Sequence, residues 1–301
     1  MQDSLPDLIQ RAAARLERMG GAPSLTRLPE RVISSASKPL ASGDKAGATS
    51  SAVRRAEVAI SPTRLAASGI TLPGSAYSRT VEEFRAVKRH VMANAKRLHA
   101  SQARESGQVV LVTSAKPGDG KTFIAINLAL ALAFEKDTCV LLMDGDAYRQ
   151  SLLESLGISA DAGWIDVVSG GPATLSDVVL KTCVSGLQVL PAGRQRPEIP
   201  ELMSSRVMKQ LVDDLTRSNP KRYIVIDGLP CLTSSEPSIL AGLTGQTLFV
   251  VSAHRTSRDD IDSSLRLLNT SPNVNLILNM VAPSLAEQFR DDSQAYRYGA
   301  G

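Results

Sequence analysis

The sequence predicts an α/β fold in which a doubly wound, mostly parallel sheet carries helices on both faces and follows a flexible N-terminal arm. After Gly107 the chain alternates between short β-branched runs and segments long enough to form crossover helices. The short runs are apolar throughout, as a parallel sheet that is covered on both faces requires. Six runs are predicted as strands: residues 108–115, 138–144, 187–193, 222–228, 246–253 and 273–281.

The chain before this sheet divides into three predicted parts. Residues 1–19 place apolar side chains at helical spacing, with Arg and Glu on the other side, which predicts an amphipathic helix. Residues 20–79 are rich in Ser, Ala, Gly, Pro and Arg and poor in large apolar residues, so we expect a flexible linker. Residues 80–107 contain a second predicted helix and a connection, with Thr80 as the N-cap in a capping box with Glu83.

The sheet domain is predicted to span residues 108–287, and a tail follows it. Residues 288–301 carry two tyrosines, several charges and almost no large aliphatic side chain. Such a segment has little reason to pack on a core, so we expect it to be flexible and able to reach another subunit.

Charge is divided unevenly along the chain. Residues 1–107 hold 17 Lys and Arg against 9 Asp and Glu, whereas residues 108–301 hold 17 against 21, so the net charge of +4 belongs to the arm. We interpret the arm as solvated and expect no nucleic-acid partner. The three cysteines are far apart, which favours reduced thiols and a cytoplasmic protein. No run approaches the roughly 18 apolar residues of a membrane span, and the first residues lack the order of a signal peptide.

The strongest functional signal is a strand, a glycine-rich loop and a helix in immediate succession. The strand VVLVTS is followed by the loop AKPGDGKT and the apolar helix FIAINLALALA. This order is typical of a P-loop, in which backbone N–H groups and a helix N-terminus hold a polyphosphate. The strict pattern has Gly where Ala115 stands, but the flanking elements support the assignment. The sequence therefore predicts a P-loop NTPase sheet that binds ATP and Mg²⁺ through Lys116, Pro117, Gly118, Asp119, Gly120, Lys121, Thr122 and Phe123.

Acidic residues mark two of the predicted strands. The run VLLMD ends in Asp144 and is followed by Asp146, and the run YIVID ends in Asp227. Ligands of open α/β sheets bind at the carboxyl ends of the strands, and a carboxylate there is costly to bury without a cation. Each aspartate alone could equally cap the next turn. Together they favour a nucleotide-bound Mg²⁺ with Thr122, Asp144 and Asp227 as ligands.

These motifs resemble a known family. The segment LLMDGDAYRQSLL resembles the Walker A′ motif of the deviant-Walker group, which includes the MinD and ParA ATPases and the bacterial tyrosine kinases. The loop SAKPGDGKT, with Pro before Gly, resembles the kinase branch, as do GWIDVVSGG, PELMSS and VEEFRAVKR. The N-terminal SLPDLIQRAAARLE resembles the tyrosine autokinases that accompany exosortase-type exopolysaccharide loci. The third acidic motif departs from the usual Asp-x-Pro-Pro, because it reads Asp-Gly-Leu-Pro from Asp227.

The resemblance implies an ATP-dependent protein-tyrosine autokinase that regulates exopolysaccharide or capsule biosynthesis and export. Lys121 would hold the phosphates, and Asp144 or Asp146 would accept the proton of a phenol whose pKa is about 10. The phosphoacceptors would lie in the tail of a neighbouring subunit, and the helix after residue 79 would make oligomer contacts. The residues implied for these two roles are Tyr296 and Tyr298, and Glu82, Arg85 and Arg89.

The implied partners are further copies of the chain, a membrane polysaccharide co-polymerase or chain-length determinant protein, and a cognate tyrosine phosphatase. We expect the chain to be peripheral to the inner membrane through such a partner. Two alternatives stay open. Lys116 occupies the position of the signature lysine of MinD-like dimers and favours an ATPase switch of the MinD or ParA kind. The altered motif at Asp227 favours a nucleotide-binding regulator of a co-polymerase that transfers no phosphate.

Overall fold

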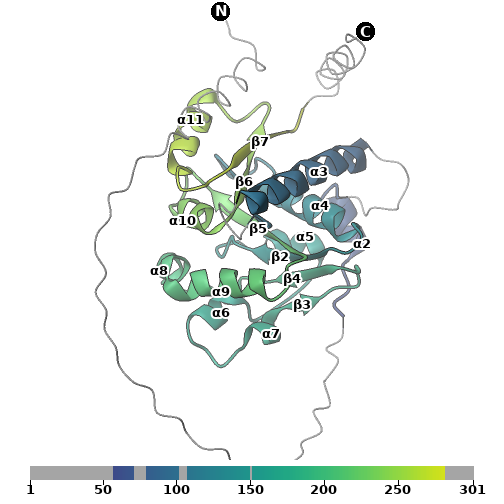
Figure 1. The fold of residues 1–301 in the computed structure, drawn as a ribbon, viewed down its shortest axis with the longest axis vertical. Coiled ribbons are helices and arrows are strands. Elements are labelled where there is room, and N and C mark those ends of the chain that lie inside the picture. The colour runs from purple at the N-terminus through teal and green to yellow at the C-terminus, as the bar shows by residue number, and fades with distance from the viewer. Residues whose placement is uncertain (1–56, 71–78, 102–106, 150, 282–301) are drawn as a thin grey trace, which may run out of the picture. The chain divides into compact units, whose positions relative to one another are not determined.

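The structure of the protein is a computed structural model that describes residues 57–70, 79–101, 107–149 and 151–281. Its centre is a seven-stranded sheet with the order β3-β4-β2-β5-β1-β6-β7 (Figure 1). All neighbouring strands are parallel except β3, which is antiparallel to β4. The strands are β1 (Val109–Ser114), β2 (Cys139–Asp144), β3 (Leu180–Lys181), β4 (Leu187–Leu190), β5 (Arg222–Pro230), β6 (Gln246–Ser252) and β7 (Val274–Asn279).

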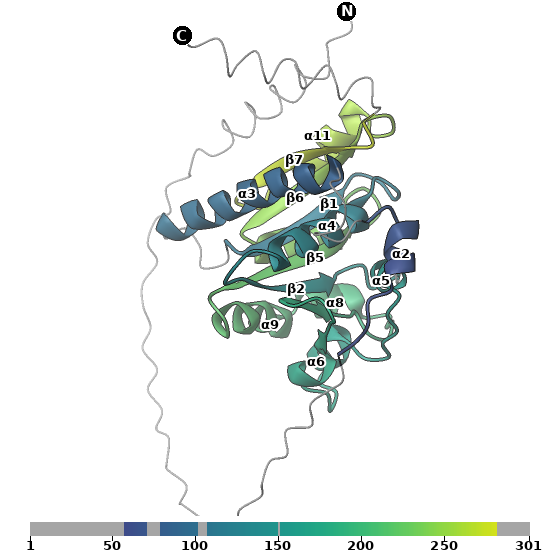
Figure 2. The same ribbon diagram turned by 90° about the vertical axis from the view of Figure 1, so that its right-hand side faces the viewer.

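The predicted doubly wound sheet is confirmed by the packing of its two faces. Successive residues of a strand point to opposite sides, so Val110 and Val112 of β1 join one hydrophobic cluster and Val109 and Leu111 join the other. Figure 2 shows α3 and α4 on one side of the sheet and α8 and α9 on the other. The first face carries α2 (Pro62–Ala67), α3 (Arg79–Ala100), α4 (Lys121–Ala133) and α5 (Ser151–Leu156), and the second carries α6 (Trp164–Val168), α7 (Leu175–Val178), α8 (Ile199–Ser204), α9 (Arg206–Arg217), α10 (Glu236–Leu243) and α11 (Arg258–Leu267).

Helix α4 is the most buried helix, because it lies between the sheet and α3. Eleven of its thirteen residues are buried, and its Ala and Leu content combines strong helix propensity with an apolar surface all round. Helix α3 covers it with an apolar stripe that includes Phe84 and Val91. The ring of Phe84 packs edge-on against Phe123 of α4, with ring centroids 5.9 Å apart.

The start of α3 differs from the sequence prediction. The helix begins at Arg79, so Thr80 lies inside its first turn and is not the N-cap. Arg79 donates to Glu83 at 2.8 Å, an i,i+4 pair on the exposed side of that turn. Glu83 is therefore engaged by a basic side chain and not by a capping-box backbone.

Residues 57–70 correct the prediction of a flexible linker over the whole of residues 20–79. Ser61 caps α2 by accepting from the backbone N–H of Arg64, Pro62 occupies the first turn, and the apolar side chains around them are buried. Val58 continues the sheet edge beyond β3 through backbone hydrogen bonds with residues 181 and 183. The overall composition of the linker concealed this short apolar set: Ile60, Leu65 and Ile70. The predictions for residues 1–19, for most of the linker and for the tail lie outside the described residues.

Within the described ranges, no helix combines the length and apolar character that a bilayer crossing demands.

Candidate active site

Three adjacent strands bring the predicted site together. Strand β5 lies between β1 and β2, so the loop after β1 and the acidic residues of β2 and β5 meet at one edge of the sheet. Asp144 is the last residue of β2 and lies opposite Asp227 of β5 in the parallel register. Asp227 does not end its strand, as the sequence suggested, because β5 continues for three residues to Pro230 beside the loop.

The loop between β1 and α4 has the backbone of a phosphate cradle. Gly118 and Gly120 have φ values of 85° and 98°, a left-handed conformation that disfavours any side chain. The backbone N–H of Lys116 donates to Oδ2 of buried Asp119 at 2.9 Å and closes the loop. Gly120 then starts α4, whose first N–H groups have no earlier carbonyl within the helix to bind. These groups form an anion site at a helix N-terminus.

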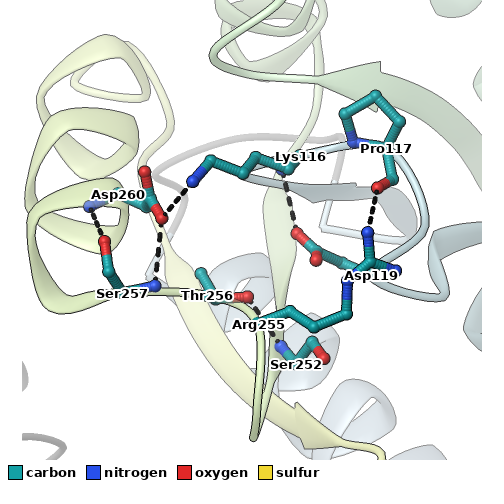
Figure 3. Close-up of polar contacts among 8 residues, drawn as sticks. All are labelled: Lys116, Pro117, Asp119, Ser252, Arg255, Thr256, Ser257 and Asp260. Atoms are coloured by element: carbon teal, nitrogen blue, oxygen red, sulfur yellow. Dashed lines mark hydrogen bonds and ion pairs between the residues drawn. The ribbon is translucent and has the colours of Figure 1, made fainter.

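Residues from the far half of the chain contact this loop, and sequence reasoning missed them. Lys116 Nζ lies 2.6 Å from Oδ2 of Asp260, near the start of α11. Arg255 donates to the carbonyl oxygens of Pro117 and Gly118, and Asn279 donates to that of Asp119 (Figure 3 draws the Lys116 and Arg255 contacts). Their signal in the sequence is weak, because only their positions after β6 and at the end of β7 place them near the site.

The three predicted carboxylates are buried together. Asp144, Asp146 and Asp227 are 1%, 6% and 1% exposed, and Lys121 beside them is 8% exposed. Burial raises the pKa of Asp144 well above its usual value, and the charges of Asp227 and Asp146 raise it further. Burial also raises the pKa of Asp146 and brings that of Asp227 to about 6, with Lys121 opposing the shift in both. The cluster is short of positive charge.

Thr122 and Asp227 have the geometry of a cation site. The Thr122 hydroxyl donates to Oδ2 of Asp227 at 2.7 Å and lies 3.3 Å from the Ser151 hydroxyl. Oδ1 of Asp227 is buried and receives no hydrogen bond from any residue that the structure describes. A buried, orphaned carboxylate oxygen beside a hydroxyl suits a hard divalent cation, so these residues fit Mg²⁺. Ser151 was not predicted as part of this site.

The turn after β2 is fixed by hydrogen bonds from three directions. The backbone N–H of Asp146 donates to Oδ1 of Asp144 at 3.2 Å, and the indole N–H of Trp164 donates to the Asp144 carbonyl at 2.8 Å. Gly145 donates its N–H to the carbonyl of Asp227 at 2.9 Å. A Cβ on Gly145 would lie 2.9 Å from that same carbonyl oxygen, so only glycine allows the two acidic turns to approach so closely.

Two of the predicted nucleotide-binding side chains have other partners. Phe123 packs on Phe84, so its ring serves the core and only its backbone N–H faces the helix N-terminus. Lys116 is paired with Asp260, as described above. In α3, Glu82 pairs with Arg85 on the same helix, while Arg89 is exposed. Tyr296 and Tyr298 lie outside the described residues.

Comparison with known proteins identifies the family of this sheet. A family profile described as ParA, NUBPL iron-transfer P-loop NTPase matches residues 105–292. The tyrosine-protein kinase ptk of Acinetobacter johnsonii is 28% identical over 191 residues, which are 63% of this chain and 26% of that protein. The tyrosine-protein kinase CpsD of Streptococcus agalactiae is 24% identical over 210 residues, which are 69% of this chain and 86% of that protein.

A solved structure agrees with these relatives. The crystal structure of the VpsO kinase domain is 31% identical, with a TM-score of 0.53, and the match covers 65% of this chain and 98% of that domain. The chain spans about a quarter of the length of the ptk kinase and most of the length of CpsD. The resemblance to bacterial tyrosine kinases that the motifs indicated is therefore confirmed.

The replacement Asp227→Asn tests the electrostatic cost of the buried cluster. A folded-state pKa of about 6, above the usual 3.8, means that the folded protein loses stability as the pH rises from about 4 to about 6. Asn cannot ionise, so without nucleotide the variant should unfold at a higher temperature than the natural protein, by roughly 4 °C or more at pH 8.

The increase in unfolding temperature should be much smaller at pH 4, where Asp227 is protonated in the folded protein. Calorimetry at both pH values measures the difference, with Asp214→Asn on the exposed side of α9 as the control. A gain of equal size at both pH values would contradict this origin.

Proposed function

Because the chain belongs to the ParA family of P-loop NTPases, we propose that it is an ATP-dependent protein-tyrosine autokinase that regulates exopolysaccharide or capsule biosynthesis and export. The observation that carries the proposal is the cluster of Asp144, Asp146 and Asp227 around Lys121 and Thr122. The similarity to named tyrosine kinases supports the same reaction class. The exopolysaccharide role rests on the resemblance of the N-terminal segment to exosortase-associated autokinases.

In this reaction the phenol oxygen of a tyrosine attacks the γ-phosphorus of ATP, the bond to the β-phosphate oxygen breaks, and ADP leaves. The loop amides and Lys121 hold the phosphates, which is mostly a matter of position and charge. Thr122, Asp227 and Asp144 would hold Mg²⁺, which when bound neutralises phosphate charge. Asp144 or Asp146 takes the phenol proton, and a carboxylate whose pKa is raised accepts a proton more readily than an ordinary one.

The proposed partners follow from the same reaction. A second copy of the chain presents its tail tyrosines, a membrane polysaccharide co-polymerase or chain-length determinant protein recruits and activates the kinase, and a tyrosine phosphatase resets it. We propose a cytoplasmic protein that is peripheral to the inner membrane through the co-polymerase. The basic arm, with its 17 Lys and Arg in residues 1–107, suits a position beside an anionic membrane surface.

An ATPase switch of the MinD or ParA kind is the second candidate. Lys116 favours it, because the ammonium stands where MinD-like dimers carry their signature lysine. In this structure the ammonium pairs with Asp260 of the same chain. The tail tyrosines and the Glu-Glu-Phe-Arg segment of α3 favour the kinase. A third candidate, a nucleotide-binding regulator of a co-polymerase without phosphoryl transfer, rests on the altered motif after Asp227.

The variant Lys121→Met should reduce tyrosine phosphorylation to background, because it removes a phosphate-facing charge. The variant should still fold, but it also loses the cation that opposes the pKa shifts of Asp146 and Asp227, so its unfolding midpoint is measured alongside. Incubation with γ-labelled ATP measures the product. Label on tyrosine in the natural protein supports the kinase, and label released only as inorganic phosphate supports the switch. Nucleotide binding with neither product supports the regulator. Lys209→Met, at an exposed position of α9, is the matched control and should behave as the natural protein.

Helix α3 should contribute to subunit contacts. Arg85 and Arg89 are exposed, so reversing both to Glu changes the surface charge by four without disturbing the core. We expect sedimentation velocity to show a shift to smaller species. The double reversal of Lys209 and Arg217 on α9 makes the same change in net charge elsewhere and should leave the distribution as it was. If the sedimentation distribution of the α3 variant is unchanged, α3 packs on its own domain and makes no subunit contact.

The replacement of Tyr296 and Tyr298 by Phe should remove most of the incorporated phosphate and keep the oligomer closed. Phosphate on the tail adds nearly two negative charges per tyrosine and would oppose rebinding beside the acidic cluster. Tyr148 is a poor competing acceptor, because burial and its hydrogen bond to Glu236 raise its pKa to about 12. Peptide mapping that places the phosphate chiefly on Tyr77, Tyr148 or Tyr223 would rule out this account.

A further inference from the structure

Three consecutive carbonyl groups of the phosphate loop are held from outside the loop. Arg255 donates from Nη2 to the Pro117 oxygen at 3.3 Å and from Nη1 to the Gly118 oxygen at 2.9 Å. Asn279 donates from Nδ2 to the Asp119 oxygen at 3.0 Å. Among the residues that the structure describes, no backbone N–H donates to these three carbonyls, so two side chains take the place of regular secondary structure.

The direction of these carbonyls fixes the direction of the amides that follow. In a trans peptide unit the C=O and the next N–H point in opposite directions. Holding the oxygens of residues 117, 118 and 119 outward therefore turns the N–H groups of Gly118, Asp119 and Gly120 toward the other side. That side is the inner face of the loop at the N-terminus of α4, where a polyphosphate binds.

The two supporting side chains come from a turn and a strand end that are joined by hydrogen bonds. Arg255 lies in a tight turn after β6, in which the N–H of residue 255 and the Thr256 side chain both bond to Ser252. Figure 3 shows this turn with Arg255 reaching across to Pro117. The N–H of Ala253 donates to the carbonyl of Asn279 at 3.0 Å and ties the turn to the end of β7. Because β6 pairs with β1, the base and the loop are carried by neighbouring strands.

The loop glycines are in direct contact with these side chains. A Cβ on Gly118 would lie 2.6 Å from Nη1 of Arg255, and a Cβ on Gly120 would lie 2.1 Å from Nδ2 of Asn279. The two glycines are therefore required for their positive φ and also for the space that Arg255 and Asn279 occupy. The two glycines leave the space that the side chains of Arg255 and Asn279 fill.

A further contact secures the first part of the loop. Lys116 pairs with Asp260, whose carboxylate also accepts from the N–H of Ser257 in a capping box at the start of α11. These partners lower the pKa of Asp260 to about 2, so the carboxylate is ionised throughout the physiological range. The loop is thus bonded to the first turn of α11 through Lys116 and to the β6–α11 connection through the carbonyls of Pro117 and Gly118.

We propose that Arg255, with Asn279, is a positioning residue for nucleotide binding: it preorganises the loop amides for the β-phosphate without touching the nucleotide. The inference rests on the nucleotide-binding part of the proposed function and is independent of whether the phosphoryl group reaches a tyrosine. A preorganised loop loses less conformational entropy when the nucleotide binds. Loss of the support should therefore weaken the binding of nucleotides that have a β-phosphate and leave the binding of those that lack one unchanged.

The test compares Arg255→Met with the natural 301-residue chain by titration calorimetry with Mg²⁺-ADP and with AMP. Met keeps much of the side-chain length and removes both donors. We expect the Kd of ADP to rise about tenfold, as the loss of two hydrogen bonds to an exposed group allows, and the Kd of AMP to change by less than twofold. Arg255→Lys keeps a cationic donor that can bond to one of the two carbonyls, so it should restore most of the ADP affinity. Arg217→Met on α9 is the matched control and should bind both nucleotides normally.

Two results would overturn the inference. One is an ADP affinity in Arg255→Met within twofold of the natural protein. The other is an equal loss for ADP and AMP, because that pattern would mean a general distortion or a contact with the nucleoside. The unfolding midpoint of each variant is measured alongside and should be unchanged. A natural protein that binds ADP but incorporates no phosphate into tyrosine rejects the kinase and leaves this result standing, so the two failures are separate.

Discussion

Three carboxylates that are buried together beside one lysine are the constraint on which the site depends. Burial is the first cause of the raised pKa of Asp144, Asp146 and Asp227, and Lys121 opposes the shift only at Asp146 and Asp227. The sheet order β2-β5-β1 creates this cost, because it places Asp144 and Asp227 in register and the P-loop beside them. Such a cluster destabilises the protein alone and becomes favourable when a cation and a polyphosphate arrive. In the proposed function, relief of this instability would contribute to the affinity of the site for Mg²⁺-nucleotide.

The sequence predicted the parts of the fold that are encoded in contiguous residues. The long parallel strands have apolar side chains on both faces, and the P-loop is a single run whose glycines sit at the two left-handed positions. Strand β3 was missed because it has only two residues, too few for a periodic pattern. The packing of residues 57–70 was missed because three apolar side chains were outweighed by the polar composition around them.

The contacts that support the loop could not be read from the sequence for a different reason. Arg255 and Asn279 are separated from their loop partners by 137 and 160 residues, respectively, and neither belongs to a local motif. An exposed Arg after a strand is usually solvated, and an Asn that ends a strand usually begins a turn. The pairing of β1 with β6 brings Arg255 to the loop, and the pairing of β6 with β7 brings Asn279 there as well. The packing of Phe123 in the core could not be predicted for the same reason, because its partner Phe84 comes from a separate helix.

The position of Lys116 bears on the choice between a kinase and a switch. Lys116 stands at the position that resembles the signature lysine of MinD-like dimers, and here its ammonium is paired with Asp260 of the same chain. The lysine side chain is 47% exposed, and pairs of that kind contribute roughly 0–1 kcal/mol, so the phosphates of a second subunit would compete successfully with one carboxylate. Releasing Lys116 would leave the hydrogen bonds of Arg255 and Asn279 in place. The hydrogen bonds to the carbonyls of residues 117–119 therefore do not depend on the Lys116–Asp260 pair, and the same loop can serve a kinase or an ATPase switch. What separates the two is the acceptor of the phosphoryl group, which is a tyrosine for the kinase and a water molecule for the switch.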